Sequence, residues 1–370
     1  MKLFDLYKGK KVLITGHTGF KGSWLSLWLH ELGAGVIGYA LDPKFPEDNF
    51  VVTGLADKVK DIRGDIRNKD FLLQVFKQEK PEIVFHLAAQ PLVLESYSDP
   101  LETFDTNIMG TANMLEAVRQ TDSVHSAIMI TSDKCYENRE MIWGYRENDP
   151  MGGHDPYSAS KGAAELVINS YRKSFFANKD TAIASVRAGN VIGGGDWSEH
   201  RLIPDIIKAV EAGRTIGLRN PQATRPWQHV LEPLSGYLLL GAKMMEKPKK
   251  YAEAWNFGPF PHDVTPVQTV VNKMIGYLEK GQWKDISQNN QHHEAQLLTL
   301  DITKALTKLG WKPALNLDET ICMTVDWYKQ KGASADMYEV CKNQIHEYMD
   351  ICGKQFFCGD YHSGTSGKSM

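Results

Sequence analysis

A glycine-rich turn between an apolar strand and a helix is the feature that most constrains the fold of this chain. Residues 12–23 read VLITGHTGFKGS, with a glycine at every third position from Gly16 to Gly22. Glycines at this spacing let the backbone turn tightly and approach a pyrophosphate, and the helix that follows offers free N–H groups and its positive dipole end. A glycine fingerprint alone is a weak signal, but a strand before it and a helix after it make it specific. The sequence therefore predicts a dinucleotide-binding turn formed by Gly16, His17, Thr18, Gly19, Phe20 and Gly22.

Apolar runs and amphipathic stretches alternate through the first half of the chain. Nearly continuous apolar strands separated by helices are typical of a parallel sheet covered on both faces. The predicted fold class is therefore α/β, a Rossmann-type doubly wound parallel sheet with a smaller mixed α/β domain. The expected strands are 11–15, 35–39, 59–63, 82–87, 127–131 and 182–187, and the expected helices include 21–32, 69–79, 111–119 and 158–174.

The alternation breaks after about residue 188, where residues 193–197 and 219–228 have the composition of loops. We expect residues 1–188, with about 226–250 packed back on them, to form the dinucleotide-binding domain. Residues of about 189–225 and 251–350 are expected to form the substrate domain. The small, polar residues at the end of the chain predict a flexible tail over 353–370.

Composition excludes several classes of protein. A formal net charge of −3 offers no electrostatic footprint for nucleic acid, and no run approaches the roughly 18 apolar residues that a membrane span needs. The charged start of the chain leads straight into a strand pattern, so no secretory signal is expected. The five cysteines are scattered without a C-x-x-C pair and indicate reduced thiols in a cytoplasmic protein. The twelve histidines show no ligand spacing with nearby acids, so no metal is expected.

Two acidic residues after the expected strands indicate which dinucleotide binds. Asp42 follows the second strand, where an acid can hold the ribose hydroxyls of NAD and repel a 2′-phosphate. The alternative is a turn residue before Pro43, and Lys44 nearby keeps NADP open. Asp65 follows the third strand and could accept a hydrogen bond from the adenine amino group, or equally cap the next helix. Together these residues favour NAD.

A hydroxyl, a tyrosine and a lysine form the predicted catalytic group. Tyr157 and Lys161 are four residues apart, which places both on one face of a helix. A nearby ammonium favours the phenolate, so we expect Lys161 to lower the pKa of Tyr157 toward that of a useful base. Ser132, just past the strand 127–131, completes the group. The alternative is that Tyr157 and Lys161 lie together on a helix by chance, and the predicted dinucleotide turn makes this alternative less favoured.

The chain resembles the extended short-chain dehydrogenase/reductase family, in its NAD-dependent epimerase/dehydratase branch, over nearly its whole length. The matching segments are TGHTGFKG (15–22), GDIRN (64–68), HLAAQ (86–90), DTNIMGTANMLEA (105–117), TSDKCY (131–136), YSASK (157–161) and RAGNVIGGGDW (187–197). Within the family, GHTGFKGSW, TSDKCY and RPWQHV look most like the segments of 4,6-dehydratases that act on CDP-glucose. Only this resemblance, and nothing in the composition, points to cytosine.

The resemblance implies the site residues and their roles. The catalytic set is Ser132, Asp133, Lys134, Tyr157 and Lys161, and the NAD contacts extend to Ile66, Leu87, Ala88, Ala89, Thr106 and Thr131. Tyr157 takes the proton of the sugar 4-hydroxyl while the C4 hydride passes to NAD. A base then removes the C5 proton, Asp133 protonates the departing C6 hydroxyl, and the hydride returns to C6. Lys134 is our choice for the C5 base, and the alternative is that Lys134 stabilises the enolate.

The predicted substrate contacts lie in the second half of the chain, except for Gln90. Asn190 resembles the family asparagine that contacts the sugar diphosphate, and Gln90 is expected to face the sugar. Arg201 and Arg225 are candidates for the pyrophosphate, with a surface charge as the alternative for each. His229 either contacts substrate or lies in the core.

Other functions stay open on the sequence alone. A nucleotide-sugar 4-epimerase or reductase of the same family would keep Tyr157 and Lys161 but give Asp133 and Lys134 no role, and a catalytically silent dinucleotide sensor would need none of them. The resemblance also implies a homodimer or homotetramer, in which Ala163, Ala164 and Leu166 of one helix and Met114, Leu115 and Val118 of another either form the seam or belong to the protomer's own core. Such dehydratases supply CDP-linked deoxysugars for surface polysaccharide, including lipopolysaccharide O-antigen.

Overall fold

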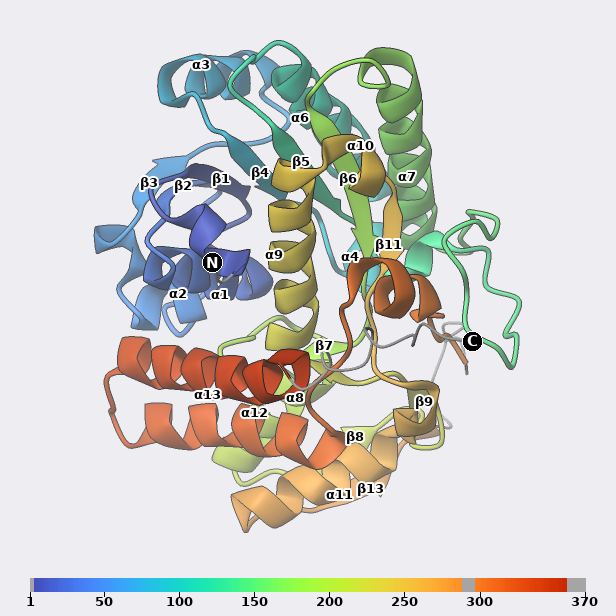
Figure 1. Ribbon diagram of the computed structural model, residues 1–370. Coiled ribbons are helices and arrows are strands. Elements are labelled where there is room, and N and C mark those ends of the chain that lie inside the picture. The colour runs from blue at the N-terminus through green and yellow to red at the C-terminus, as the bar shows by residue number, and fades with distance from the viewer. Residues whose placement is uncertain (1–2, 288–296, 358–370) are drawn as a thin grey trace, which may run out of the picture.

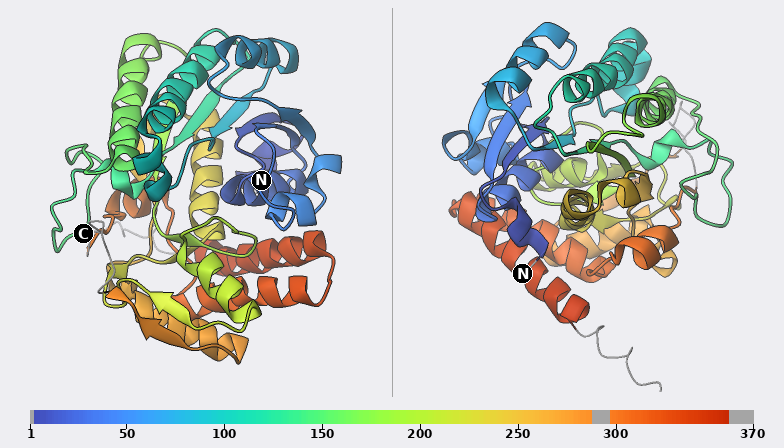
Figure 2. Two further views of the ribbon diagram at one scale, coloured as in Figure 1. Left: turned by 180° about the vertical axis from the view of Figure 1, so that it is seen from behind. Right: turned by 45° about the horizontal axis from the view of Figure 1, so that its top comes forward.

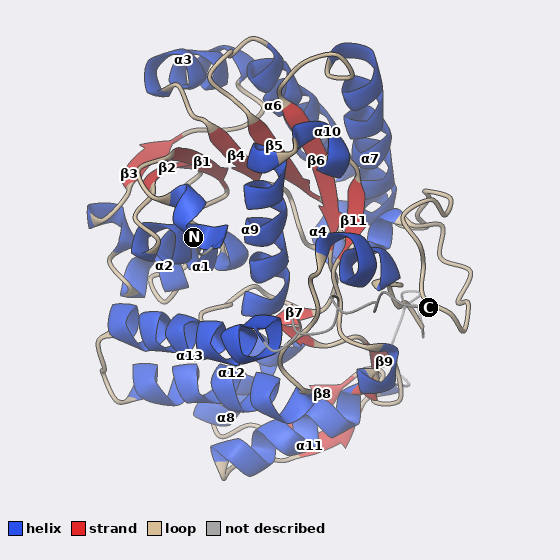
Figure 3. Cartoon of the chain, in the orientation of Figure 1, coloured by secondary structure: helices blue, strands red, loops and turns tan. Residues whose placement is uncertain are grey.

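The computed structural model describes residues 3–287 and 297–357, and its centre is a seven-stranded parallel sheet in the order β11-β6-β5-β4-β1-β2-β3 (Figures 1 and 3). The strands are β1 (Lys11–Thr15), β2 (Gly35–Ala40), β3 (Lys60–Arg63), β4 (Ile83–His86), β5 (Ser126–Ile130), β6 (Ala182–Arg187) and β11 (Ala254–Asn256). The strand order changes direction between β1 and β4, the switch point at which such sheets bind ligands beyond their carboxyl ends. The predicted fold class is confirmed.

Six of the seven strands match the prediction to within one residue at either end. The exception is β11, which was not predicted because three residues are too short to show a periodic pattern. It becomes a strand by pairing with β6, with Ala254 opposite Ser185 and Asn256 opposite Arg187. Residues 254–256 thus lie in the central sheet, whereas the sequence analysis assigned them to the substrate domain.

Alternate residues of each strand face opposite layers of helices. Val12 and Ile14 of β1 pack on one side with α1 (Phe20–Glu31) and α9 (Leu231–Glu246), whereas Leu13 between them packs on the other. The second layer consists of α3 (Lys69–Glu79), α6 (Gly110–Arg119) and α7 (Pro156–Phe175). Burial on both faces is why these strands are nearly continuous in apolar residues.

Most of the second half of the chain forms a layer below the sheet in the view of Figure 1. Its helices are α8 (Leu202–Glu211), α11 (Val267–Leu278), α12 (Leu317–Gly332) and α13 (Met337–Phe357). Short two-stranded pairs join β7 (Val191–Ile192) to β10 (Gln228–His229), β8 (Ile216–Leu218) to β13 (Trp283–Asp285), and β9 (Thr224–Arg225) to β12 (Thr265–Pro266). Both views in Figure 2 show α13 (red) lying across the bottom of the sheet domain.

The end of the chain differs from its prediction. Helix α13 continues through residues 353–357, the start of the predicted tail, and 358–370 lie outside the described residues. Four cysteines form no disulfide within the described chain, and Cys358 lies outside it. Among the described helices none is long and apolar enough to span a membrane.

Candidate active site

The glycine-rich turn joins β1 to α1 at the carboxyl edge of the sheet. Gly16 has φ +73°, and a Cβ there would lie 2.8 Å from the backbone nitrogen of Ala88. A Cβ on Gly22 would collide with the carbonyl oxygen of Gly16, so this glycine lets the helix pack against the strand end. Helix α1 begins after Gly19 without a side-chain cap, which leaves its first N–H groups free to bind an anion. The turn therefore fits the pyrophosphate of a dinucleotide.

Two predicted turn residues direct their side chains elsewhere. His17 is fully buried, with Nε2 2.9 Å from Oδ1 of Asp61 and its ring edge-on to Phe50. Burial lowers the pKa of His17 despite the carboxylate. The hydroxyl of Thr18 donates to the carbonyl of Leu41 at 3.0 Å. Of these two residues, only the backbone is available to the turn.

Asp42 and Asp65 lie at the ends of adjacent strands. Both side-chain oxygens of Asp65 accept hydrogen bonds from Arg67, at 2.6 to 2.9 Å, and a carboxylate with these bonds keeps one acceptor position for an adenine amino group. The side chain of Asp42 is 86% exposed and its carboxylate lies 3.5 Å from Nε of Arg63. Asp42 is thus the available acid for ribose hydroxyls, with a guanidinium beside it.

The remaining predicted cofactor residues line the wall beyond β4 or lie behind it. The backbone N–H groups of Leu87 and Ala88 donate to Oγ1 of Thr15 at 3.1 Å. Ile66 is buried against Gly110, whereas Ala89 and Thr106 are half-buried.

Ser132 and Asp133 follow β5 and form the opening of a one-turn helix. Oγ of Ser132 donates to Oδ1 of Asp133 at 2.9 Å and accepts from the backbone N–H of Lys134 at 3.2 Å. Asp133 is 3% exposed, and its Oδ2 is buried with no hydrogen-bond partner among the described residues. That oxygen lies against Gly189, where any Cβ would overlap it. The fold therefore holds a buried carboxyl group beside the predicted hydroxyl.

Tyr157 and Lys161 lie in the first turns of α7, as their spacing predicts. Asp155 caps this helix by accepting from the backbone N–H of Ser158 at 2.8 Å. Both side chains are buried, and Nζ of Lys161 is 6.0 Å from the centre of the Tyr157 ring. Burial raises the pKa of Tyr157 to about 12, and its hydrogen bond with Ser132 offsets this only in part. The pKa of Tyr157 is therefore raised in the protein alone, and not lowered as expected, because burial outweighs the opposing effects of Ser132 and of the charge of Arg201.

Lys21, in the first turn of α1, is a site residue that the sequence analysis missed. Burial lowers its pKa to about 8, and the charge of Arg201 lowers it further, while Asp133 acts in the opposite direction. Burial also lowers the pKa of Lys161 to about 8, and the charge of Lys21 contributes to that shift. Three cations from α1, α7 and the start of α8 thus surround Tyr157 and Asp133. The signal in the sequence was a lysine inside the glycine motif GFKG.

Replacing Lys21 with methionine is expected to move the alkaline limit of activity to higher pH. Lys161 stabilises the phenolate only while it is protonated, so turnover falls as pH rises through the pKa of Lys161. Removing the charge of Lys21 raises that pKa, and protonated Lys161 persists to higher pH. The measurement is the pH profile of kcat/KM, with the exposed Lys280→Met as the control. An unchanged alkaline limb in Lys21→Met would contradict the coupling.

Arg201 and Asn190 are the substrate-side residues that lie closest to this group in the fold. Arg201 forms an ion pair with Asp196 at 3.0 Å, and its charge acts on Tyr157 as well as on Lys21. Asn190 has φ +49°, a left-handed conformation that costs free energy in a residue with a side chain and that clusters at functional sites.

The side chains of the other predicted residues contact other parts of the protein. His229 is fully buried and edge-on to Trp24, and burial lowers its pKa to about 3, so its side chain belongs to the core. Gln90 is 9% exposed and binds Thr103 and the backbone of Leu92, so it holds its own loop. Thr131 donates to Glu165 at 2.5 Å, and half-buried Arg225 donates to the carbonyl of Thr224 at 2.9 Å. A sequence pattern does not show whether a polar side chain will bind another part of the protein or a substrate.

A buried ion pair supports the catalytic group from behind. Nη2 of Arg187, the last residue of β6, lies 2.8 Å from Oε2 of Glu165, and both side chains are 4% exposed. Burial opposes the charge of Glu165, but Arg187 outweighs burial and holds the pKa of Glu165 below its usual value. Glu165 follows Lys161 by one helical turn and also accepts from Thr131, the residue before Ser132.

We expect Arg187→Met to destabilise the protein by about 3–5 kcal/mol, because the Glu165 carboxylate is then buried without a countercharge. Urea unfolding followed by circular dichroism measures the change. The double variant Glu165→Met/Arg187→Met is the control, and it should regain part of the loss because no unpaired charge remains. A loss below about 1 kcal/mol, the size of a surface ion pair, would contradict this account.

A parallel sheet with a glycine turn at its switch point and a Tyr-x-x-x-Lys helix beside it defines an extended short-chain dehydrogenase/reductase. The chain belongs to the GDP-mannose 4,6 dehydratase family, whose model matches residues 13–324.

Individual relatives agree with this family. The chain is 50% identical over 351 residues to CDP-glucose 4,6-dehydratase of Salmonella typhimurium, covering 93% of this chain and 98% of that protein. It is 26% identical over 326 residues to UDP-glucose 4-epimerase of Mycolicibacterium smegmatis, covering 87% and 99%. Among solved structures, dTDP-glucose 4,6-dehydratase of Bacillus anthracis in complex with NAD matches with a TM-score of 0.73 at 20% identity, covering 89% and 100%.

Proposed function

We propose that this protein dehydrates CDP-D-glucose to CDP-4-keto-6-deoxy-D-glucose, as a hydro-lyase that ends each cycle with its cofactor unchanged. The observation that carries the proposal is the buried carboxyl group of Asp133 beside Ser132, with one oxygen unpartnered at the carboxyl edge of the sheet. Dehydration needs an acid for the leaving hydroxyl, and an epimerase or reductase does not. The 50% identical relative named for CDP-glucose supports the nucleotide.

NAD is the cofactor that the site fits. The glycine turn and uncapped start of α1 would hold its pyrophosphate, Asp42 its adenosine ribose, and Lys161 its nicotinamide ribose. When bound, NAD supplies the hydride acceptor for C4 and the hydride donor for C6. The protein's own part is to hold the sugar and place protons.

Tyr157 is the base for the 4-hydroxyl in this mechanism. Because burial raises its pKa to about 12, ionisation depends on the positive charges around it, and Arg201 is one that lowers this pKa. Lys161 and Lys21 are the other two cations in the group. Ser132, hydrogen-bonded to Tyr157, orients the phenolic oxygen toward the 4-hydroxyl.

Asp133 is the acid for the 6-hydroxyl, and Lys134 is proposed as the base for the C5 proton. A lysine takes a proton only in its neutral form, which burial or a nearby cation favours. Lys134 is exposed in the protein alone, so the bound sugar would have to cover it. Stabilisation of the enolate by Lys134 is the competing role. Deuterium exchange at C5 separates the two, because Lys134→Met abolishes exchange only if Lys134 is the base.

The test of the function is incubation of the purified protein and NAD with CDP-glucose in deuterated water, in parallel with the dTDP-, UDP- and GDP-sugars. Mass spectrometry follows loss of water and gain of one deuterium at C5, while absorbance follows reduced cofactor. Dehydration of the cytidine sugar alone, with no reduced cofactor left behind, is the expected result. Conserved mass would overturn the proposal in favour of the epimerase, and accumulating reduced cofactor would favour a dehydrogenase.

We also propose a dimer or tetramer in the cytoplasm, in the supply of deoxysugars for surface polysaccharide such as O-antigen. The suggested seam needs correction, because Met114, Leu115, Val118 and Ala164 are buried inside the protomer. Among the large apolar side chains exposed nearby, Leu101, Met109 and Phe175 are candidates for the seam, whereas Leu166 lines a separate cavity. Light scattering tests the assembly, and a stable, active monomer would exclude it.

A further inference from the structure

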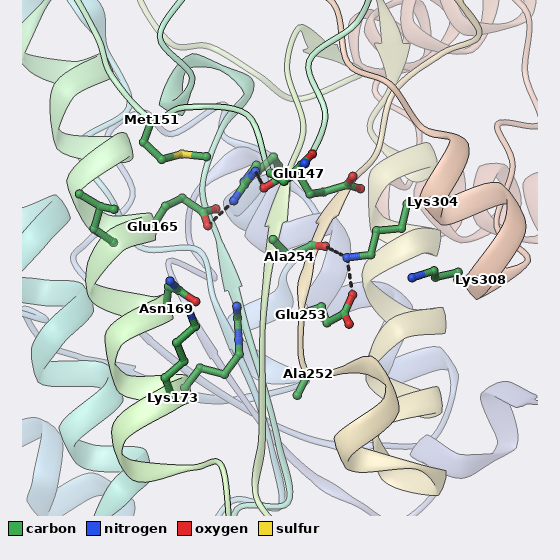
Figure 4. Close-up of a pocket in the computed structure, with 14 residues that line it drawn as sticks. Glu147, Met151, Glu165, Asn169, Lys173, Ala252, Glu253, Ala254, Lys304 and Lys308 are labelled. Atoms are coloured by element: carbon green, nitrogen blue, oxygen red, sulfur yellow. Dashed lines mark hydrogen bonds and ion pairs between the residues drawn. The ribbon is translucent and has the colours of Figure 1, made fainter.

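A cavity of about 540 Å³ lies between α7 and the edge strand β11, on the flank of the sheet domain (Figure 4). Asn169 and Lys173 line it from α7, Glu253 and Ala254 from β11 and the turn before it, and Lys304 and Lys308 from the opposite side. Figure 4 shows these side chains converging from the two walls. The volume is in the range that binds organic small molecules. None of the residues assigned above to catalysis or to the cofactor lines this cavity.

The three carboxylates in the cavity wall are already satisfied by the protein. Glu165 pairs with Arg187 at 2.8 Å, and Glu253 pairs with Lys304 at 2.5 Å. Glu147 accepts the backbone N–H of Asn256 at 3.0 Å. Five cations line the cavity against these three carboxylates, so an excess of positive charge remains.

The cations outside the two ion pairs are Arg172, Lys173 and Lys308, and Glu253 acts on Arg172 and Lys308 only at longer range. None of them has a carboxylate within ion-pair distance among the described residues. Arg172 uses Nε and Nη2 to donate to the carbonyl of Ile183 and to Ser185, which fixes its guanidinium in place. Lys173 and Lys308 are exposed and free to turn toward a bound group. A fixed guanidinium flanked by two mobile ammonium groups is suited to a diphosphate.

We propose that this cavity is a second ligand site, separate from the catalytic one, that binds a nucleoside diphosphate. The diphosphate contacts Arg172, Lys173 and Lys308, which form no ion pair with a carboxylate among the described residues. The nucleoside lies against Met151 and Leu166, and the amides of Asn148 and Asn169 offer hydrogen bonds to its base. The cavity volume favours a nucleotide over inorganic phosphate, which would leave most of the space and both apolar side chains without contact.

The position of the cavity connects it to turnover. Glu165 and Arg187 contribute to its wall, and the same pair supports Thr131 and lies one helical turn from Lys161. An anion close to Arg187 weakens the ion pair between Arg187 and Glu165. A ligand at this site is therefore expected to change kcat without competing with the sugar nucleotide.

The experiment compares CDP, ADP and inorganic pyrophosphate as probes on the full chain saturated with NAD. Calorimetry measures binding to the wild type, to Lys173→Gln/Lys308→Gln, and to the matched control Lys280→Gln/Lys284→Gln, which removes two exposed lysines elsewhere. We expect a CDP-binding event, beyond the one at the catalytic site, that weakens at least about ten-fold in the first double variant and stays unchanged in the control. Acetylation followed by mass spectrometry should show that CDP protects Lys173 and Lys308 and leaves Lys280 reactive.

Four results would overturn the proposal. A single class of CDP sites in the wild type would mean that only the catalytic site binds. Equal binding by the two double variants, or unprotected Lys173 and Lys308, would place the second event elsewhere. Pyrophosphate binding as tightly as CDP would exclude recognition of the nucleoside. None of these readouts depends on which sugar the enzyme dehydrates.

Discussion

Tyr157→Phe is expected to reduce turnover by about 10²–10⁴-fold, the range that a positioned general base contributes. The substitution removes one oxygen and leaves the buried ring in place, so the packing of α7 against the one-turn helix after β5 persists. Without the phenolic oxygen nothing accepts the 4-hydroxyl proton, and the first step stops. The measurement is the initial rate of CDP-glucose consumption, together with NAD affinity by calorimetry.

NAD binding should stay within about three-fold of the wild type, because Lys161 and the glycine turn are untouched. Tyr277→Phe on α11 is the matched control, since that tyrosine is 36% exposed and lies outside the site. Normal turnover by Tyr157→Phe would show that another group takes the proton. A parallel loss of NAD binding would instead assign Tyr157 to the cofactor.

Asp133→Asn is expected to separate oxidation from loss of water. The amide has nearly the same shape and can keep the contact with Ser132, but it cannot donate a proton to the departing 6-hydroxyl. We expect loss of water to fall by about 10²–10⁴-fold while C4 oxidation continues. Rapid-mixing absorbance then records reduced cofactor that persists, and mass spectrometry records no dehydrated product.

Gly189→Ala tests the same carboxyl group without changing it. The new Cβ would occupy the space of Oδ2 of Asp133, so Asp133 must turn away from its position. We expect the same phenotype as in Asp133→Asn, whereas Gly276→Ala on α11, where a Cβ meets nothing within 4 Å, leaves activity unchanged. If both Asp133→Asn and Gly189→Ala dehydrated CDP-glucose normally, Asp133 would not be the acid.

Local signals in the sequence were strong enough to predict the sheet and its cofactor turn. Strands β1, β2, β4, β5 and β6 carry mostly apolar residues because helices cover both faces of the sheet, and these runs can be recognised from the local sequence. The edge strand β3 (KDIR) is less apolar and less buried. The signals given by Gly16 and Gly22 are also local, because the tight turn and the close packing at these positions leave no room for a Cβ. The spacing of four residues places Tyr157 and Lys161 on one face of a helix, and the dinucleotide turn favours a catalytic role for the pair.

Several predicted site residues have side-chain partners far along the chain that the sequence analysis did not foresee. His17 turns inward because Asp61 lies beside it, Thr131 is held by Glu165, and Gln90 is held by Thr103. The same holds for β11, which exists only through its pairing with β6. A short sequence pattern does not reveal a contact with a residue far along the chain.

The sequence by itself determined the parallel sheet, the dinucleotide turn and the residue types at the catalytic edge, because periodicity, glycine geometry and helical spacing act over a few residues. Only the tertiary structure decided their electrostatics. It brought Lys21 of α1 into the same charged group as Lys161 of α7, and it placed Gly189 against Asp133. Burial and charge depend on distances between segments that are brought together by folding. The pKa of Tyr157 therefore rises to about 12, whereas the local sequence pattern predicted that it would fall.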